Sequence, residues 1–166
     1  MMRRLILLLL LLPFCMGATT HINGDPDISF LKTDAAHLNY IFPEDSDETV
    51  TLTAGGTNNV FGAWAEIADD QAVTLSSKAT SVLHISSIII ESASVKDKVY
   101  VLEVSYGSAK TTVVRVRGIS ATTLISHTGQ DRMRNLEIPS GETIYYRLKC
   151  ETAEATITVH FRYHYH

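Results

Sequence analysis

The sequence predicts an all-β fold: a two-sheet antiparallel sandwich, jelly-roll-like, of about nine strands, preceded by an N-terminal leader helix. Three observations predict it. The last twelve residues, 155–166, alternate apolar and polar side chains, which is the pattern of a half-buried strand. From Glu48 onward, turn-forming residues separate strand-like runs about every ten residues. No segment after the leader has the period of a long helix.

The N-terminal segment has the layout of a secretory signal peptide. Arg3 and Arg4 precede an uncharged stretch from Leu5 to Ala18, whose 14 residues are fewer than the ~20 of a membrane-spanning helix. We therefore expect a cleaved leader, membrane contact through that leader only, and a secreted, extracellular or cell-surface protein. The expected divisions are 1–17 as signal peptide, 18–47 as an N-terminal arm or linker with one helical turn near 34–39, and 48–166 as the β-sandwich domain.

Each strand-like run between two groups of turn-forming residues predicts one strand. The run from Ile88 to Ile90 is continuously apolar, as expected of a strand covered on both faces. Gly107-Ser108 between two runs predicts a hairpin. The expected strands are 49–53, 60–67, 72–76, 82–92, 98–106, 110–117, 134–138, 142–150 and 155–166. Alternation in the last strand assigns one face to Ile157, Val159, Phe161, Tyr163 and Tyr165, and the other to Thr156, Thr158, His160, Arg162, His164 and His166.

Charge and cysteine content exclude some classes of protein. Without the leader, 12 basic and 18 acidic side chains give an acidic surface, so nucleic acid is not an expected partner. Residues 18–70 hold one base and ten acids, whereas 71–166 hold eleven bases and eight acids, an asymmetry suited to head-to-tail contact between subunits. Cys150 stands alone after cleavage, so no intramolecular disulfide can form. Five arginines are expected to form either an anion-binding patch or salt bridges to the acidic half, 18–70, of the same or a neighbouring subunit: Arg115, Arg117, Arg132, Arg134 and Arg147.

Several stretches resemble small β-sandwich proteins of tailed phages. They are Thr51-Leu-Thr-Ala-Gly-Gly, Phe61-Gly-Ala-Trp-Ala-Glu-Ile, Val99-Tyr-Val-Leu-Glu-Val-Ser-Tyr-Gly, Ile138-Pro-Ser-Gly-Glu-Thr-Ile-Tyr-Tyr-Arg-Leu-Lys and the final Val-His-Phe-Arg-Tyr-His. The similarity covers roughly residues 49–166 and implies a jelly-roll-like, virion-associated or fibre-like subunit. Phage particles assemble in the cytoplasm. Either the leader is therefore not used for export, or the sandwich serves on a cell or in a secreted assembly.

His164 and His166 are the candidate metal ligands. Two residues apart on a strand, they share a face with Cα atoms ~6.6 Å apart, and His160 lies on that face too. Imidazole suits Zn, Fe, Cu and Ni. Two ligands per chain are too few for a tight site, but three chains around a symmetry axis would bring six nitrogens together. The phage resemblance implies this arrangement, since trimeric fibres hold iron in it. The alternative is a solvated outer face without metal.

Trp64 and Tyr145 are the candidate ligand-binding residues. Trp64 shares a face with Gly62 and Glu66, so its ring is exposed and can stack on a sugar if the opposite face is core. A bulge at Gly62 would instead turn the ring inward, and exposed aromatic rings also anchor protein interfaces.

The sequence contains no catalytic motif, whether a nucleophile elbow, a zinc-protease helix, a phosphate-binding loop or a Cys/His quartet. We therefore expect no enzyme, and no cofactor apart from Zn or Fe at His164 and His166. The expected function is that of a non-enzymatic structural or adhesion subunit of an extracellular or virion assembly. It would act by self-association, as a trimer, and through contacts with other structural proteins or surface glycans. The alternative is a secreted carbohydrate-binding module.

Overall fold

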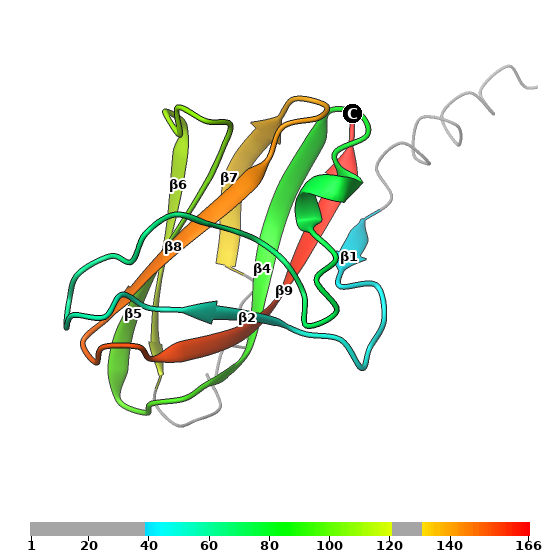
Figure 1. Ribbon diagram of the computed structural model, residues 1–166. Coiled ribbons are helices and arrows are strands. Elements are labelled where there is room, and N and C mark those ends of the chain that lie inside the picture. Colours follow the sequence, from blue (N-terminus) through cyan, green and yellow to red (C-terminus); the bar gives the residue numbers. More distant parts are fainter. Residues whose placement is uncertain (1–38, 121–130) are drawn as a thin grey trace, which may run out of the picture. The chain divides into compact units, whose positions relative to one another are not determined.

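The computed structural model describes residues 39–120 and 131–166. These residues form nine strands in two antiparallel sheets, so the predicted all-β class is confirmed (Figure 1). Sheet A contains β1 (Tyr40–Phe42), β2 (Val50–Thr53), β4 (Leu83–Ala93), β7 (Asp131–Ile138) and β9 (Thr156–Tyr165). Sheet B contains β3 (Ala65–Glu66), β5 (Lys98–Tyr106), β6 (Val113–Ser120) and β8 (Ile144–Cys150). A short 3-10 helix, η1 (Leu75–Lys78), follows β3.

Strand β9 has more partners than any other described strand of sheet A. It pairs with β4 along one side, and with β1 and then β2 along the other. The order of sheet A is therefore β1-β9-β4-β7, with β2 also beside β9. In sheet B the order is β3-β8-β5-β6. Pairing on both sides explains why the last strand does not fray, as its alternating pattern predicts.

The core is built from the inward faces of both sheets, and the two-residue period of each strand decides which side chains enter it. On β9, Ile157, Val159, Phe161 and Tyr163 are each at most 1% exposed, which confirms the predicted inward face. Burying one such large apolar side chain stabilises the fold by about 1.5–3 kcal/mol. Sheet B contributes Tyr100, Leu102, Val104, Ile144 and Leu148 to the same cluster.

The strand expected at 60–67 is wrong over most of its length, because only Ala65 and Glu66 pair with β8. The preceding residues form a loop bound to β8 by backbone hydrogen bonds. The amides of Gly55 and Gly62 both donate to the carbonyl of Leu148, at 3.2 and 3.1 Å. A Cβ on Gly55 would lie 2.6 Å from the carbonyl oxygen of Val60, so glycine is what permits this close approach.

The strand expected at 72–76 is also wrong, because this segment makes only an isolated bridge, Ala68 to Thr74, and local hydrogen bonds turn the chain on either side of it. The carboxylate of Asp69 accepts from the amides of Gln71 and Val73, at 3.0 and 2.8 Å. Thr74 then caps η1 by accepting from the amide of Ser77 at 3.3 Å. Short polar side chains that satisfy backbone donors in this way favour turns over strands.

Strand β1 lies within the segment expected as an arm. Phe42 is 1% exposed and is the partner of Phe161, so residues 40–42 belong to sheet A. The leader at 1–17 and all but the last residue of the helical turn expected near 34–39 lie outside the described residues. Within 39–120 and 131–166, no helix has the length and hydropathy needed to cross a membrane.

Candidate metal centre

Three histidines from two strands converge on the outer face of sheet A. His84 lies in β4, His164 lies in β9, and His166 follows β9 directly. Each offers one ring nitrogen such that the three atoms all lie within 4.8 Å of one another. This group, the histidine triad, contains both residues that the sequence marks as metal ligands.

The strand register assembles the triad. His84 is the Cα partner of His164 in the antiparallel pair of β4 and β9, so both side chains leave the sheet on the same face. His166 lies two residues after His164, and residues two apart in extended backbone project from the same face. Its amide donates to the carbonyl of Val82 at 3.0 Å, which holds it against the start of β4.

The rings are packed together and one of them is buried. The ring centroid of His84 lies 5.2 Å from that of His164 and 4.4 Å from that of His166. His84 is 6% exposed, and neither of its ring nitrogens makes a hydrogen bond with any described residue. A buried polar group without a partner costs about 1–3 kcal/mol. A metal ion between the three rings would give one of these nitrogens its missing partner.

Electrostatics keep the buried ring in the form that binds metal. Burial lowers the pKa of His84, and the neighbouring His166 lowers it further. The carboxylate of Glu137, the partner of His84 in β7, acts in the opposite direction. With its pKa below the usual 6.5, the ring is neutral at pH 7, and neutral imidazole is the metal-ligating state.

Three imidazoles are a known ligand set for zinc with a fourth position left for water or another ligand. With Zn–N bonds of about 2.0–2.1 Å and tetrahedral angles, the ligating nitrogens would stand about 3.3 Å apart. The triad must therefore contract on binding. His84 is buried and fixed in mid-sheet, whereas His166 is exposed and lies past the strand, so rotation of the C-terminal side chains can supply the contraction.

The triad changes what the two C-terminal histidines require. The sequence predicts that the remaining ligands of His164 and His166 come from other chains, whereas His84 offers a third ring nitrogen within one chain. The six-nitrogen site across a three-fold axis stays a prediction. The sequence does place His84 in an expected strand, between Leu83 and Ile85, which are both 0% exposed. No spacing motif connects it with His164, so only the register reveals the pair.

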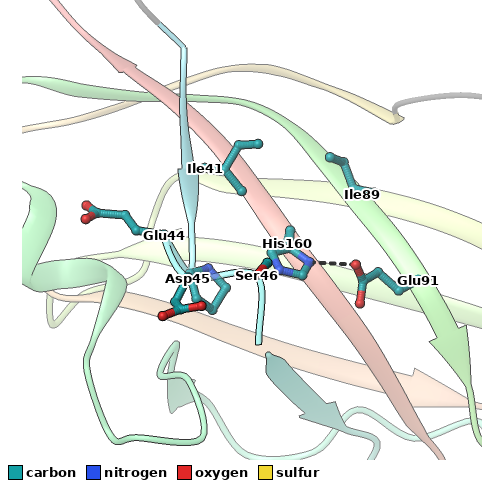
Figure 2. A pocket seen from close by; sticks show the side chains of 8 residues that line it. Ile41, Glu44, Asp45, Ser46, Ile89, Glu91 and His160 are labelled. Carbon is teal, nitrogen blue, oxygen red and sulfur yellow. Dashed lines mark ion pairs between the residues drawn. The ribbon is translucent and has the colours of Figure 1, made fainter. Parts of the chain in front are cut away.

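His160 lies on the same face of β9 but belongs to a separate pocket (Figure 2). It is 9% exposed, and its Nδ1 lies 3.1 Å from Oε1 of Glu91. His160 is therefore a matched comparison for His84: a buried histidine in the same sheet whose ring does have a partner. The pocket has a volume of about 300 Å³ and is further lined by Ile41, Pro43, Glu44, Asp45, Ser46 and Ile89.

Trp64 directly precedes β3 and Tyr145 lies in β8, and a cation of the same chain lies over each of the two rings. The guanidinium of Arg147 lies 4.6 Å from the ring centroid of Trp64 and 4.7 Å from that of Phe61. The ammonium of Lys110 lies 4.1 Å from the ring centroid of Tyr145. Both aromatic rings are half-buried. A sugar stacking on either ring would have to use the opposite ring face or displace the cation.

The outer face of sheet B also buries a carboxylate, that of Glu103 in β5, whose side chain is 1% exposed. Nε of Arg115 donates to Oε1 at 2.7 Å, and Nη2 of Arg115 donates to the same atom. Nε of Arg147 donates to Oε2 at 2.6 Å. Burial by itself raises the pKa of Glu103, but the hydrogen bonds and charges of both arginines together lower it. Arg115 and Arg147 therefore form ion pairs, but with a carboxylate of residues 71–166; the expected pairing with the acidic residues 18–70 of the same or a neighbouring subunit stays a prediction.

Comparison with known proteins gives no family for this chain. No family model matches it, and neither a curated protein nor a solved structure matches it. The functional argument therefore depends on the geometry of these residues.

Proposed function

We propose that this protein binds a zinc ion through His84, His164 and His166, and that it is a non-enzymatic structural or adhesion subunit. The observation that carries the proposal is the buried ring of His84, which has no hydrogen-bond partner among the described residues and offers a nitrogen within 4.8 Å of those of two further imidazoles. Zinc suits this site because imidazole nitrogen is a favoured ligand and three such ligands can complete all but one of its four positions.

The ion would act as a staple in the sheet. It would join the start of β4 to the end of β9, where backbone pairing finishes with the bond from His166 to Val82. A ligand that binds the folded state alone stabilises it in proportion to the logarithm of its concentration over Kd. A bound zinc ion would therefore hold the start of β4 against the end of β9 in a domain whose described residues, 39–120 and 131–166, contain no disulfide.

We also propose that the two sheets form a jelly roll. The strand order β2-β9-β4-β7 in one sheet and β3-β8-β5-β6 in the other supports this, because most successive strands alternate between the sheets. This is the connectivity of two Greek keys folded together. The β1 strand then adds to the edge of sheet A beside β9.

An extracellular or virion location and self-association complete the proposal. The signal-peptide layout of residues 1–17 supports export, and the resemblance of residues 49–166 to phage sandwich proteins supports a role in an assembly. Mass spectrometry of the purified chain tests the leader. A mass that corresponds to a chain beginning near residue 18 supports export. An intact N-terminus on protein found in the cytoplasm contradicts it.

The metal site is tested by zinc titration calorimetry and elemental analysis of the purified chain. We expect one zinc per chain, and a loss of affinity of at least 100-fold in His84→Ala, about 3 kcal/mol of binding free energy. His160→Ala, the matched control, should leave the affinity within twofold. A metal-to-chain ratio of one to three, insensitive to His84→Ala, would instead support a site across a symmetry axis.

The carbohydrate-binding alternative is tested separately. Glycan-array binding that is present in the native chain and lost in Trp64→Ala would support it. If the native chain binds no glycan on the array, the carbohydrate-binding alternative is contradicted.

A further inference from the structure

Charges of opposite sign gather at two separate places in the described part of the domain. The loop between β1 and β2 and the turn after β3 carry six carboxylates, namely Glu44, Asp45, Asp47, Glu48, Asp69 and Asp70. A hollow of about 400 Å³ lies among them, lined by Glu44, Asp45, Glu48 and Asp69 with Phe42, Val73 and Lys78. We call it the acidic hollow.

The acidic hollow is only partly neutralised from within. Lys78 pairs with Glu44 at 2.8 Å, and no other described cation forms an ion pair with these carboxylates. Local desolvation and the charges of Asp69, Asp45 and Asp70 raise the pKa of Glu48. Glu44 and Asp45 project on the side of the neighbouring pocket away from Glu91, as Figure 2 shows. Asp45 and Glu48 are therefore available to a cation from outside the chain, whereas the buried carboxylate of Asp69 already accepts from two backbone amides.

The outer face of sheet B has the opposite charge. Its cross-strand rows follow from the register: Arg147, Glu103 and Arg115 form one row, and Lys149, Val101 and Arg117 form the next. The first row contains a carboxylate that both arginines share. The second row contains none. We call this surface the cationic face, defined by Lys110, Arg115, Arg117, Arg147 and Lys149.

The second row of the cationic face leaves two cations unneutralised. Neither Arg117 nor Lys149 forms an ion pair with a described residue. The flanking side chains on β6 are apolar and exposed, with Val113 at 41% and Ile119 at 54%. Arginine, aromatic rings and exposed aliphatic residues together are the composition of a protein interface.

We infer that the cationic face binds the acidic hollow of a second copy of this chain. The two surfaces have complementary charge, and the hollow has an apolar floor in Phe42 and Val73 that can receive the aliphatic stem of a lysine or arginine. In Figure 1 the loop after β1 and strand β6 lie at opposite sides of the domain. One chain therefore cannot satisfy both surfaces itself, and the contact between copies is head-to-tail.

In a head-to-tail pair, the acidic hollow of one copy and the cationic face of the other copy stay unoccupied. Such contacts grow until the rotation between copies closes a ring, and a ring of three would be the trimer expected from the sequence. This inference names the partner and the surface for the self-association proposed above, and zinc binding does not depend on it. Because the pairs are exposed, each contributes little, and association must weaken steeply as salt rises.

The test is the mass of the purified chain by sedimentation velocity at low and high salt. One variant reverses the hollow, with Asp45→Lys and Glu48→Lys, and a second reverses the face, with Arg117→Glu and Lys149→Glu. We expect the native chain to associate at low salt, and each variant alone to associate at least tenfold more weakly. An equimolar mixture of the two variants should associate again, because a native cationic face meets a native hollow. Lys96→Glu and Glu154→Lys, at exposed positions outside both surfaces, serve as controls and should behave as the native chain.

The outcomes separate this inference from the wider proposal. If the native chain associates and the variants associate equally well, another surface mediates assembly, so the inference fails and self-association stands. If the mixture of variants stays monomeric while both are folded by circular dichroism, the inference also fails. If the native chain is a monomer at every salt concentration, both the inference and the proposed self-association are overturned, and zinc binding is still judged by its own titration.

Discussion

The outer faces of the two sheets each bury an ionisable side chain, but Glu103 of sheet B has partners and His84 of sheet A has none among the described residues. On sheet B, Glu103 is 0% exposed and receives hydrogen bonds from two arginines of neighbouring strands. On sheet A, His84 is 6% exposed and neither ring nitrogen has a partner in the described part of the chain. A buried polar group that the fold has satisfied is structural. One that the fold leaves unsatisfied, beside two more groups of the same kind, indicates a ligand from outside.

The largest expected effect is that of zinc on stability. At a free concentration of 100 to 1,000 times Kd, zinc should raise the free energy of unfolding by about 3–4 kcal/mol. His84→Phe should show no such rise, because the buried ligand is lost while an aromatic ring of similar shape remains. Chemical denaturation with and without zinc measures both. Equal stabilisation of the two proteins would mean that the ion binds elsewhere.

A smaller effect is expected from the satisfied face. Glu103→Gln should lower the free energy of unfolding by about 2 kcal/mol at pH 7, since two arginines lose a buried charged acceptor. Glu66→Gln, an exposed carboxylate on the same sheet, is the control and should change stability by less than about 0.5 kcal/mol.

The effect of Glu103 should also depend on pH with a defined sign. Its pKa is lowered in the folded state from 4.5, so its contribution is fully present above pH 4.5 and disappears as pH falls through the lower folded value. The difference in stability between the native chain and Glu103→Gln should therefore shrink below about pH 4. A difference that is constant from pH 7 to pH 3 would show that the charge of Glu103 contributes nothing.

The substitution of His84 in the absence of metal should have the opposite effect on stability to the substitution of Glu103. Without zinc, His84→Phe should raise the free energy of unfolding by about 1 kcal/mol, because it deletes two buried polar atoms that have no partner. Glu103→Gln, which removes the charge from the satisfied group, should instead destabilise. If His84→Phe destabilises the metal-free protein instead, then a group of the protein itself hydrogen-bonds the ring of His84 in solution.

The smallest expected effect concerns the cation–π contacts that cover sheet B. Trp64→Leu keeps an apolar side chain but removes the ring beneath Arg147, and should lower the free energy of unfolding by about 0.5–1 kcal/mol. Addition of salt should reduce this difference little, because Arg147 is half-buried. Thermal melts of both proteins at two salt concentrations provide the measurement.

Local pattern was a good guide where neighbours in the sequence settle the structure. Strand β5 has the predicted limits, 98–106, because turn-forming residues bound its run of strand-forming side chains at both ends. The segments around 60–67 and 72–76 were misjudged for a reason that local pattern does not contain. Gly55 allows its loop to lie against β8. The side chain of Asp69 accepts hydrogen bonds from two backbone amides, which in a strand would donate to carbonyls of an adjacent strand. Hydrogen-bond partners, not apolar spacing, decide those two segments.

The candidate site divides in the same way. Alternation along β9 places His164 and His166 on one outer face, and this is fixed by backbone geometry within a few residues. The addition of His84 depends on which strand lies beside β9 and in which register, since that choice brings side chains distant in sequence to within 4.8 Å. The pairing of Glu103 with Arg147 depends on register in the same manner.

By itself, then, the sequence determined that this is a helix-poor protein whose last strand has a buried apolar face and a histidine-bearing outer one. A strand's two faces follow from the chirality and bond geometry of its own residues. Only the tertiary structure decided that one outer face supplies two arginines to its buried carboxylate, while the other brings two imidazoles beside a third, buried one. That outcome comes from strand order, which is set by the packing of the whole core and not by any single segment.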